Sequence, residues 1–528
     1  MPAQSASATT FRPGPFSRRH LAAIAAVTVL GAAVRMSCLG DWSLWVDEAH
    51  TWRDATMPLS GENGFLATDR VKYGLTFLLL RLLYGAGVLG YDEWSMRLPF
   101  ALAGIVTIPV VAICGRRLVG AGPAVLAAGL LAFHPWHLFW SQNARGYVVV
   151  ILLSTLAIHR AHVWLGSRRV RDLLLAFWWL LLGVGSHPTA GMLAVAFGGY
   201  LLVRWATGRG ERLRWWPVLL IAAFVVWPLP GWIRDHLGFE GFFGAKAKPS
   251  LPHVFETVAY FFRPSTLLAA GLALLLAPRA LGRERALLLG CLLLVPMAVM
   301  VSVGGQVALV TARYGICTLP VVVWSVGLLV AEVARAGWRA AATADVALRR
   351  AGLTAALLLP ALLMTDYVVM TVDYFGSQHG QRARWREAAQ FVDQAAITRG
   401  RSGLRVLTTS HPTVLYYLRR KHWFQSEHDP RPNVEVHATV SWMMADGHNH
   451  EGERFHAPGA EAHLQWHLAG AERGDRLFAV MISRPELVEE RGGADVLAVL
   501  ERDFELALRL PCWIGPKDAS IYVYLPRD

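Results

Sequence analysis

Charged side chains are scarce in this sequence of 528 residues. Asp, Glu, Lys and Arg together make up 17% of it, whereas hydrophobic residues make up 54%. A typical soluble domain has about 25% charged residues, so the composition excludes a purely soluble enzyme. Long apolar runs, separated by short links that carry arginine, predict a polytopic membrane protein instead.

Acidic residues in particular are missing from the central stretches of the apolar runs. Proton- and ion-coupled transporters usually need carboxylates at membrane depth, so their absence argues against a pump. Only five cysteines are present, and four of them lie in or beside apolar runs, so we expect no disulfide framework. No glycine-rich phosphate-binding motif follows a strand-like segment, and no nucleotide site is assigned.

The net charge of +13 is unevenly distributed. Residues 1–372 contain 32 basic and 17 acidic side chains, whereas residues 373–528 contain 19 basic and 21 acidic ones. The basic excess therefore belongs to the links between apolar runs, where Lys and Arg set membrane orientation. It does not form a basic face, so we expect no nucleic-acid partner.

About eleven apolar runs approach the ~20 residues that a membrane span requires. They follow a polar tail of residues 1–20 and cover residues 21–34, 97–118, 121–139, 147–165, 172–186, 189–205, 216–233, 264–281, 286–303, 314–334 and 352–371. The sequence thus predicts a helical transmembrane domain over residues 21–372.

One further run, Tyr73–Leu89, has Arg81 at its middle, and we interpret it as an amphipathic helix on the membrane surface. With this choice, the arginine clusters between the spans all face the cytoplasm. The N-terminus is then cytoplasmic, and a large first loop (40–96) and the C-terminal region lie on the outer side of the cytoplasmic (inner) membrane.

The C-terminal region, residues 373–528, alternates between two kinds of element. Apolar strands are expected at Leu404–Thr409, Leu477–Ser483 and Ile521–Leu525. Helices are expected at Arg382–Ala396, Thr413–Leu418, Ala460–Ala469 and Pro485–Leu500. This pattern predicts an extracytoplasmic soluble α/β domain.

The acids of the membrane half gather in the first outer loop, where Asp47 and Glu48 are adjacent among aromatic residues. Neighbouring carboxylates at a low-dielectric boundary raise each other's proton affinity, which suits one of them to general-base work. A solvated loop pair is the alternative reading of the same two residues.

Two arginines stand at the expected outer ends of spans. Arg97 follows Glu93 by four residues, and this pair could simply staple a helix start. Arg145 lies in Ser141-Gln142-Asn143-Ala144-Arg145-Gly146-Tyr147, where a guanidinium beside an aromatic ring suits bidentate binding of a lipid phosphate, or serves as an interfacial anchor.

Four motifs in this order resemble those of the GT-C superfamily of membrane glycosyltransferases. They are Trp45-Val46-Asp47-Glu48-Ala49, Glu93 to Pro99, Ser141 to Tyr147, and Ala312-Arg313-Tyr314 with Pro320. The chain is most similar to the branch of protein O-mannosyltransferases and lipid A aminoarabinose transferases, including a tail that begins Arg384-Trp385-Arg386-Glu387.

This resemblance implies a GT-C-like fold and an inverting transfer of a hexose or pentose from a polyprenyl-phosphate donor to an acceptor hydroxyl. Asp47 matches the catalytic base, and Glu48 would orient the acceptor or a metal. The donor phosphate would be bound by Lys72, Arg145, Tyr147, Arg97 and Arg313. Where many relatives have His-Pro-Pro, this chain has Lys72-Tyr73-Gly74, which puts a metal role there in doubt.

The lipid-linked sugar is a substrate, and the acceptor is a glycan, a lipid or a protein. A divalent metal is compatible with these acids, but no motif supports one. The histidines of the C-terminal region, His463 and His467 among them, match no zinc spacing. The alternatives are a ligase or polymerase of lipid-linked oligosaccharides, which need not use Asp47 and Glu48, and a lipid-linked sugar flippase, which would line its spans with polar residues.

Overall fold

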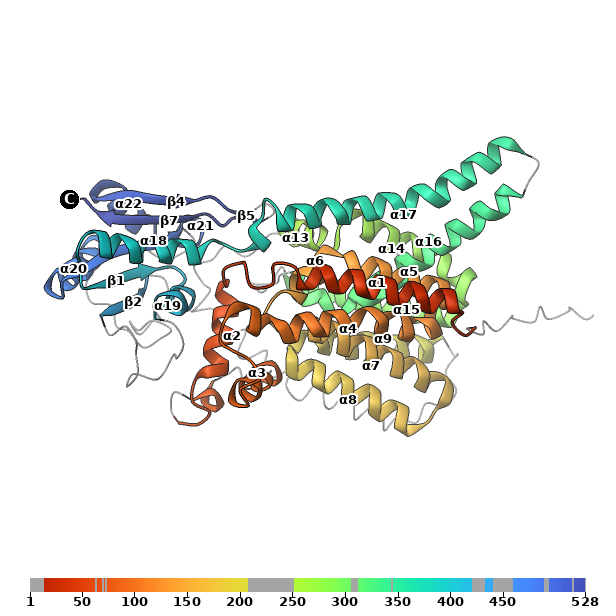
Figure 1. Ribbon diagram of the computed structural model, residues 1–528. Helices are drawn as coiled ribbons and strands as arrows, with labels where there is room; N and C mark the ends of the chain where they lie inside the picture. Colours follow the sequence, from red (N-terminus) through yellow and green to blue (C-terminus); the bar gives the residue numbers. More distant parts are fainter. Residues whose placement is uncertain are drawn as a thin grey trace, which may run out of the picture.

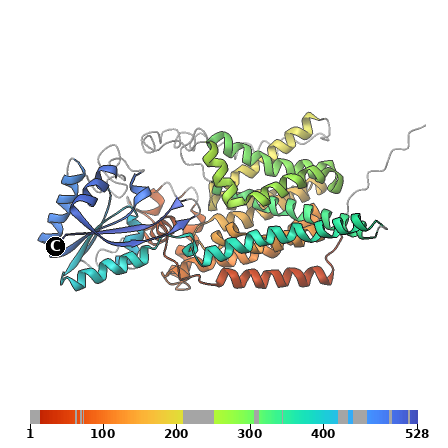
Figure 2. The same cartoon turned by 90° about the horizontal axis from the view of Figure 1, so that it is seen from above.

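The computed structural model describes residues 14–61, 64–68, 71, 74–207, 251–304, 312–342, 345–419, 433–439, 459–488, 493–514 and 517–527. The chain forms a bundle of long helices with a sheet domain at one end (Figures 1 and 2). The start of the first helix lies at the end of the bundle that is farther from the sheet domain (Figure 1). All five cysteines are free.

The bundle contains ten long helices among the described residues. They are α1 (Arg18–Met36), α4 (Glu93–Val119), α5 (Ala121–Phe133), α7 (Tyr147–Ser167), α8 (Val170–Ser186), α9 (Met192–Ala206), α14 (Pro264–Leu281), α15 (Arg283–Gly304), α16 (Leu319–Ala341) and α17 (Val346–Phe375). Shorter elements join them: α6 (Pro135–Ser141), η3 (Pro188–Gly191), α13 (Leu251–Phe262), η4 (Ala312–Thr318) and η5 (His379–Gln381). The ten helices coincide with ten of the expected runs, and the run 216–233 lies outside the described residues.

Seven helical stretches of the described chain are long and apolar enough to cross a membrane: 18–36, 93–119, 147–167, 188–206, 264–281, 313–341 and 346–375. The protein is therefore a multi-pass membrane protein. The count of about eleven spans stays a prediction, because α5, with 13 residues, is about 20 Å long at 1.5 Å per residue. That length falls short of the ~30 Å hydrocarbon core of a bilayer.

Helix α16 lies at the centre of the bundle and packs against α4, α5, α14 and α17. Its apolar side chains are buried from Leu319 to Val330. Close packing depends on a missing side chain on α4: a Cβ at Gly115 would collide with the ring of Trp324. That ring donates from Nε1 to the carbonyl oxygen of Val111 at 2.9 Å, which satisfies its only polar atom within the core.

The segment between α1 and α4 forms two helices and a short turn, and it lies between the bundle and the sheet domain (Figure 1). These elements are α2 (Val46–Thr56), η1 (Phe65–Ala67) and α3 (Leu75–Gly85). Helix α3 occupies part of the run 73–89 and has only 11 residues, about 16 Å at 1.5 Å per residue, which is too short to span a bilayer. Its length supports the interpretation as a helix that does not cross the membrane.

The sheet domain has five strands in the order β2-β1-β3-β7-β4. The strands are β1 (Gly403–Thr408), β2 (Val434–Ala438), β3 (Arg476–Ser483), β4 (Phe504–Leu510) and β7 (Ile521–Pro526); a small hairpin pairs β5 (Trp513–Ile514) with β6 (Lys517–Asp518). Strand β1 is parallel to β2 and β3, whereas β7 is antiparallel to β3 and β4. The sheet is therefore mixed, and three of its strands lie at the expected positions.

Helices cover both faces of this sheet. Alternate residues of β3 point to opposite faces: Leu477 and Met481 pack with α18 (Trp385–Thr398) and α19 (His411–Arg419). Phe478 and Val480 pack on the other face with α20 (Ala460–Arg473), α21 (Arg484–Val488) and α22 (Gly493–Asp503). Because α19 also contacts α2, the sheet domain packs directly against the segment between α1 and α4.

Candidate active site

Asp47 lies in the first turn of α2 beside two arginines from later parts of the chain. Arg313 Nη1, at the start of η4, donates to Asp47 Oδ2 at 2.9 Å. Arg145 Nη2, in the link between α6 and α7, lies 4.0 Å from the same oxygen, and Arg145 Nη1 donates to Thr51 Oγ1 at 3.2 Å. These three charged side chains, the Asp47 cluster, are 21%, 27% and 15% exposed in the order Asp47, Arg313, Arg145, so solvent reaches each of them.

Aromatic rings form one wall of the Asp47 cluster. Tyr147, the first residue of α7, is buried, and the Arg313 guanidinium lies 6.0 Å from its ring centre. The ring of His187 is 4.5 Å from that of Tyr147, and Tyr314 stacks on His187 at 6.0 Å. Four of the expected site residues, Asp47, Arg145, Tyr147 and Arg313, are thus brought together from three separate stretches of sequence.

Glu48 points away from the Asp47 cluster, into the protein. Arg97 donates two parallel hydrogen bonds to its carboxylate, from Nε to Oε1 at 2.8 Å and from Nη2 to Oε2 at 2.9 Å. Arg382 Nε donates to Oε2 at 3.0 Å, and the backbone N–H of Ala144 donates to Oε1 at 2.9 Å. All three charged side chains, the Glu48 cluster, are fully buried.

The sequence suggested two roles for Arg97, a helix-start pair with Glu93 and a ligand of the donor phosphate, and its position in the structure fits neither. Its five N–H groups donate to the Glu48 carboxylate and to the carbonyl oxygens of Leu39, Trp42 and Ser43, so none is left for a phosphate. It also forms no staple with Glu93, because Glu93 pairs with Arg386 of α18 at 2.6 Å. The physical reason is burial: a guanidinium without water needs a carboxylate and carbonyls around it.

The expectation that the two acids raise each other's proton affinity is wrong for Glu48. Burial alone would raise its pKa, but the charges of Arg382 and Arg97 and the bond from the Ala144 backbone outweigh burial and lower the pKa to about 2. Glu48 is therefore a permanent anion at neutral pH.

Helix geometry explains why adjacent carboxylates have different surroundings. Successive residues of an α-helix point about 100° apart at 3.6 residues per turn, so Asp47 faces outward when Glu48 faces inward. Both lie in the first turn of α2, where the helix dipole favours negative charge. The first turn of α2 thus presents one reachable and one sequestered carboxylate.

Further contacts attach the sheet domain to the segment before α2. The Tyr417 hydroxyl, on α19, donates to Glu93 Oε1 at 3.0 Å and accepts from the Leu44 backbone N–H at 2.6 Å. Arg386 Nη2 donates to the carbonyl oxygen of Gly40 at 2.9 Å as well as to Glu93. The stretch that leads into Asp47 is therefore fixed from both the bundle and the sheet domain.

Sequence reasoning missed Arg382, although it identified the Arg384-Trp385-Arg386-Glu387 motif two residues later. The only signal in the sequence was a cluster of arginines directly after the last apolar run. Lys72 lies outside the described residues. So do His448, His450 and Glu451 of the C-terminal region, whose side-chain types are common metal ligands.

Among the residues that the structure describes, no group of three or more His, Cys, Asp or Glu side chains could hold a metal ion. His463 and His467 are buried and their ring centres are 4.6 Å apart, and the ring of His437 lies tilted with its centre 4.8 Å from that of His467. These rings pack between α20 and β2.

Residues 76–232 match the family described as dolichyl-phosphate-mannose-protein mannosyltransferase. The matched stretch begins in α3 and includes Arg97, Arg145 and Tyr147. No curated protein matches the chain.

Solved structures with the same fold cover nearly the whole chain. The ArnT protein from Cupriavidus metallidurans bound to undecaprenyl phosphate is similar with a TM-score of 0.54 at 14% identity, over 96% of this chain and 98% of that one. Its apo form gives a TM-score of 0.51, also at 14% identity, over 96% and 97%. The oligosaccharyltransferase AglB from the archaeon Archaeoglobus fulgidus, in complex with an inhibitory peptide and a dolichol-phosphate, gives 0.52 at 11% identity, over 96% and 74%.

The family match covers two of the four motifs, Glu93 to Pro99 and Ser141 to Tyr147. Residues 76–232 are thus similar to the dolichyl-phosphate-mannose-protein mannosyltransferase family, and the chain as a whole has the fold of ArnT and AglB.

Proposed function

We propose that the protein transfers a sugar from a polyprenyl-phosphate donor to an acceptor hydroxyl, with inversion at the anomeric carbon. The observation that carries this proposal is a partly exposed carboxylate, Asp47, held beside two guanidinium groups from Arg145 and Arg313. A base and two cations side by side are the groups that such a transfer needs. The undecaprenyl phosphate bound to ArnT, a protein of the same fold, supports the donor class.

The acceptor oxygen loses its proton to Asp47 while it attacks the anomeric carbon. The bond between that carbon and the phosphate oxygen breaks, and its electron pair stays on the departing polyprenyl phosphate. Within the described chain, both ion pairs of Asp47 use Oδ2, which leaves Oδ1 to take the proton. Attack opposite to the leaving phosphate inverts the configuration.

Arg145 and Arg313 bind the phosphate and stabilise the negative charge that grows on it as the bond breaks. Arg313 is the cation closest to Asp47, so a phosphate bound there lies beside the base.

Tyr147 positions Arg313, since the Arg313 guanidinium lies over the Tyr147 ring. Glu48 and Arg97 act as positioning residues, because their fully buried side chains bond each other and the surrounding backbone. We keep Lys72 as a further phosphate ligand on the sequence motif alone. No metal is needed for this scheme.

The experiment that tests the proposal is donor binding to an Arg145 variant. We expect Arg145→Gln to raise the KM for a labelled polyprenyl-phosphate sugar about tenfold or more, because a hydrogen bond to a charged group is worth about 1.5–3 kcal/mol and 1.4 kcal/mol is a factor of ten. The KM for the acceptor should stay within about twofold of the wild-type value, on the reading that Arg145 contacts only the donor. Steady-state transfer in proteoliposomes measures both constants.

Arg401→Gln is the matched control, because Arg401 is an exposed arginine of the sheet domain that pairs with the exposed carboxylate of Asp475. It should leave both constants unchanged. Equal rises in the two KM values of Arg145→Gln, or no rise, would remove Arg145 from the phosphate site.

We also propose the orientation that the arginine clusters indicate: residues 1–20 in the cytoplasm, residues 21–372 in and at the cytoplasmic membrane, and residues 373–528 outside. The start of α1 and the sheet domain lie at opposite ends of the bundle, which supports this topology (Figure 1). An alkaline phosphatase fused after Asp528 should be active, since that enzyme folds only outside the cytoplasm. An inactive phosphatase with an active cytoplasmic reporter at the same position would reverse the orientation.

A further inference from the structure

A buried glutamine, Gln142, connects three other parts of the chain to the link that carries Arg145. It follows the last residue of α6 and lies three positions before Arg145. The residue is fully buried. Both polar atoms of its side chain, and its backbone carbonyl oxygen, form hydrogen bonds with residues outside the link. A buried polar network in which the members are bonded makes the surrounding elements rigid.

The side-chain amide of Gln142 caps the C-terminal end of α1. Its Nε2 donates to the backbone carbonyl oxygens of Ser37 at 2.6 Å and of Arg35 at 3.0 Å. Carbonyl oxygens at the end of a helix have no partner within the helix, so the amide supplies one. In return, Arg35 Nε donates to the hydroxyl of Ser141 at 3.1 Å. The segment that leads to Asp47 leaves α1 at this point, so Gln142 fixes its start.

The other bonds of Gln142 reach the end of α17 and the start of the sheet domain. The buried Tyr374 hydroxyl donates to Gln142 Oε1 at 2.8 Å. Arg382 Nη2 donates to the backbone carbonyl oxygen of Gln142 at 2.6 Å, and Arg382 Nη1 donates to the Tyr374 hydroxyl at 3.2 Å. Because Arg382 also bonds Glu48, the neighbour of Asp47, Gln142 is connected to α2 as well.

These bonds hold Arg145 close to Asp47. Arg145 Nη2 lies 4.0 Å from Asp47 Oδ2, although the two residues are 98 positions apart in the chain. The Arg145 backbone N–H donates to the carbonyl oxygen of Asn143 at 2.7 Å, so a tight turn joins Gln142 to Arg145. A shift of Gln142 is therefore passed on to Arg145, and a misplacement of about 1 Å can cost an enzyme about 10²-fold in rate.

We propose that Gln142 is a positioning residue, which holds Arg145 at the distance from Asp47 that donor binding requires. This inference rests on the proposed function of Arg145 as a ligand of the donor phosphate. Gln142 touches no substrate in this scheme, because its side chain is fully buried and bonded within the protein. Its loss therefore acts on the reaction through Arg145.

The test is a double-mutant cycle between Gln142 and Arg145 in the full-length protein in proteoliposomes. Methionine has the length of glutamine but forms none of its hydrogen bonds. Gln142→Met should therefore raise the KM for a labelled polyprenyl-phosphate sugar about tenfold, within the ~10²-fold that a small misplacement can cost. In the Arg145→Gln background, the same change should alter that KM by less than about twofold, because no guanidinium is left to position.

Gln381→Met is the matched control for the loss of a buried glutamine. Gln381 Nε2 donates to the Tyr260 hydroxyl at 3.1 Å and to Gln378 Oε1 at 2.9 Å, and neither bond involves the Asp47 cluster. Both methionine variants should lower the unfolding temperature, since each removes buried hydrogen bonds. Only Gln142→Met should raise the KM for the donor.

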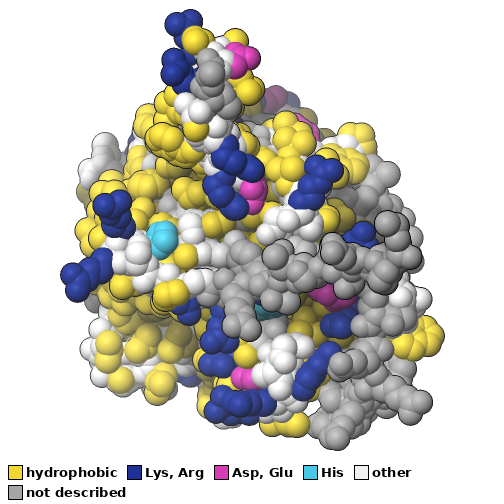
Figure 3. Space-filling model, turned by 90° about the vertical axis from the view of Figure 1, so that its right-hand side faces the viewer, with side chains coloured by type: hydrophobic (Ala, Val, Ile, Leu, Met, Phe, Trp, Pro, Cys, Tyr) yellow, Lys and Arg dark blue, Asp and Glu magenta, His cyan; other side chains and the backbone are white. Residues whose placement is uncertain are grey.

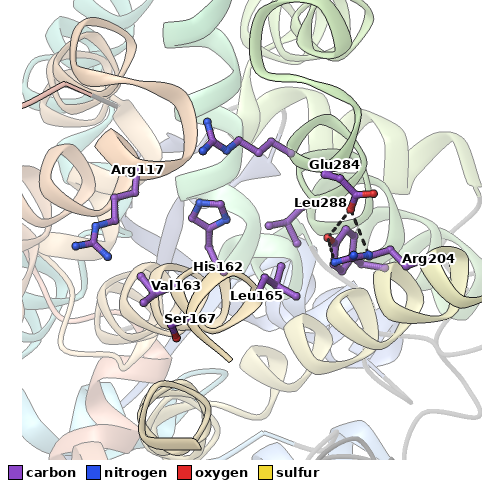
Figure 4. Close-up of a pocket in the computed structure, with 11 residues that line it drawn as sticks. Arg117, His162, Val163, Leu165, Ser167, Arg204, Glu284 and Leu288 are labelled. Atoms are coloured by element: carbon purple, nitrogen blue, oxygen red, sulfur yellow. Dashed lines mark hydrogen bonds and ion pairs between the residues drawn. The ribbon is translucent and has the colours of Figure 1, made fainter. Parts of the chain in front are cut away.

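Tyr374→Phe keeps the test valid if Gln142→Met fails to fold, because it removes only the hydroxyl that bonds Gln142 Oε1. It should raise the KM for the donor about fivefold, the worth of one hydrogen bond. Tyr200→Phe is its control. The buried Tyr200 hydroxyl donates to Glu284 at 3.1 Å, and it lines a cavity together with Glu284 and Arg204, whose ion pair Figure 4 shows.

This cavity lies at the opposite end of the bundle from Asp47. Helix α7 runs from Tyr147, in the aromatic wall of the Asp47 cluster, to Ser167, in the lining of the cavity, about 30 Å at 1.5 Å per residue. Basic side chains outnumber acidic ones on the surface of this end (Figure 3), and the proposed orientation places it in the cytoplasm. Tyr200→Phe should therefore leave the KM for the donor unchanged.

Three results would overturn the positioning role while Arg145 kept its own. They are equal rises in the donor KM of Gln142→Met and Gln381→Met, effects of Gln142→Met and Arg145→Gln that multiply in the double variant, and an unchanged KM in both Gln142→Met and Tyr374→Phe. An unchanged donor KM in Arg145→Gln alone would instead overturn the proposed phosphate site, and the positioning role with it.

Discussion

Replacing Asp47 with asparagine should lower the rate of sugar transfer about 10³-fold while the protein stays folded. Asparagine has the size of aspartate but cannot take a proton from the acceptor, and general-base catalysis contributes about 10²–10⁴-fold. Asp47 is partly exposed, and its ion pair with Arg313 is of the kind that contributes only about 0–1 kcal/mol to stability. The measurement is single-turnover transfer from a labelled polyprenyl-phosphate sugar by purified protein.

Asp41→Asn provides the matched control, because Asp41 is an exposed aspartate six residues earlier in the same segment. It should transfer sugar at the wild-type rate. If Asp47→Asn does so too, with an unchanged unfolding temperature, the base lies elsewhere and the proposed mechanism fails.

Replacing Glu48 with glutamine should lower the free energy of unfolding by about 3–5 kcal/mol, the usual loss when one partner of a buried ion pair is removed. Glutamine keeps the shape of glutamate but leaves the buried charges of Arg97 and Arg382 without an anion. We therefore expect a lower unfolding temperature and faster proteolytic release of the sheet domain. Thermal unfolding of the protein in detergent measures the first, and limited trypsin digestion the second.

Glu93→Gln is the control that separates the effect of losing a buried ion pair from the effect of losing any ion pair. Glu93 also binds an arginine of α18, but its pair with Arg386 is 13% and 27% exposed, so water can compensate for the missing charge. Its unfolding temperature should fall by much less than that of Glu48→Gln. Equal falls in the unfolding temperatures of the two variants would mean that the Glu48 cluster stabilises the fold no more than the partly exposed pair of Glu93 does.

The difference in stability between the wild type and Glu48→Gln should also depend on pH. The pKa of Glu48 is lowered from 4.5 to about 2 by the fold, so its contribution to stability is complete above about pH 4.5 and is lost as the pH falls towards 2. The stability difference between wild type and Glu48→Gln should therefore be constant near neutral pH and shrink over this window. A difference that does not change between pH 4.5 and 2 would contradict the lowered pKa.

Much of the fold followed from the sequence, because apolar periodicity and length are local properties. The apolar runs of the membrane half and three strands of the sheet domain were located in this way. Strands β2 and β4 were not, since β4 is largely exposed and alternates weakly. The antiparallel addition of β7 and β4 depends on pairing partners far along the chain, which no local pattern reports.

The site was harder to predict, because it depends on which way side chains point. The sequence placed Asp47 in the first outer loop and Arg145 at the expected outer end of a span, and the structure brings both beside Arg313. It could not show that Glu48 turns inward or that its partners would be Arg97 and Arg382. The i,i+4 spacing from Glu93 suggested a local partner for Arg97, and a buried carboxylate 49 residues away proved the stronger one.

The link between Glu48 and Arg382 has a consequence for how the protein is made. These residues are 334 positions apart, so a ribosome that has synthesised the whole bundle has not yet supplied the second counter-ion of Glu48. Until Arg382 has been synthesised, the segment that bears Asp47 carries a buried acid that lacks one of its two counter-ions. We therefore expect chains that end before Arg382 to be more easily degraded than the full-length protein.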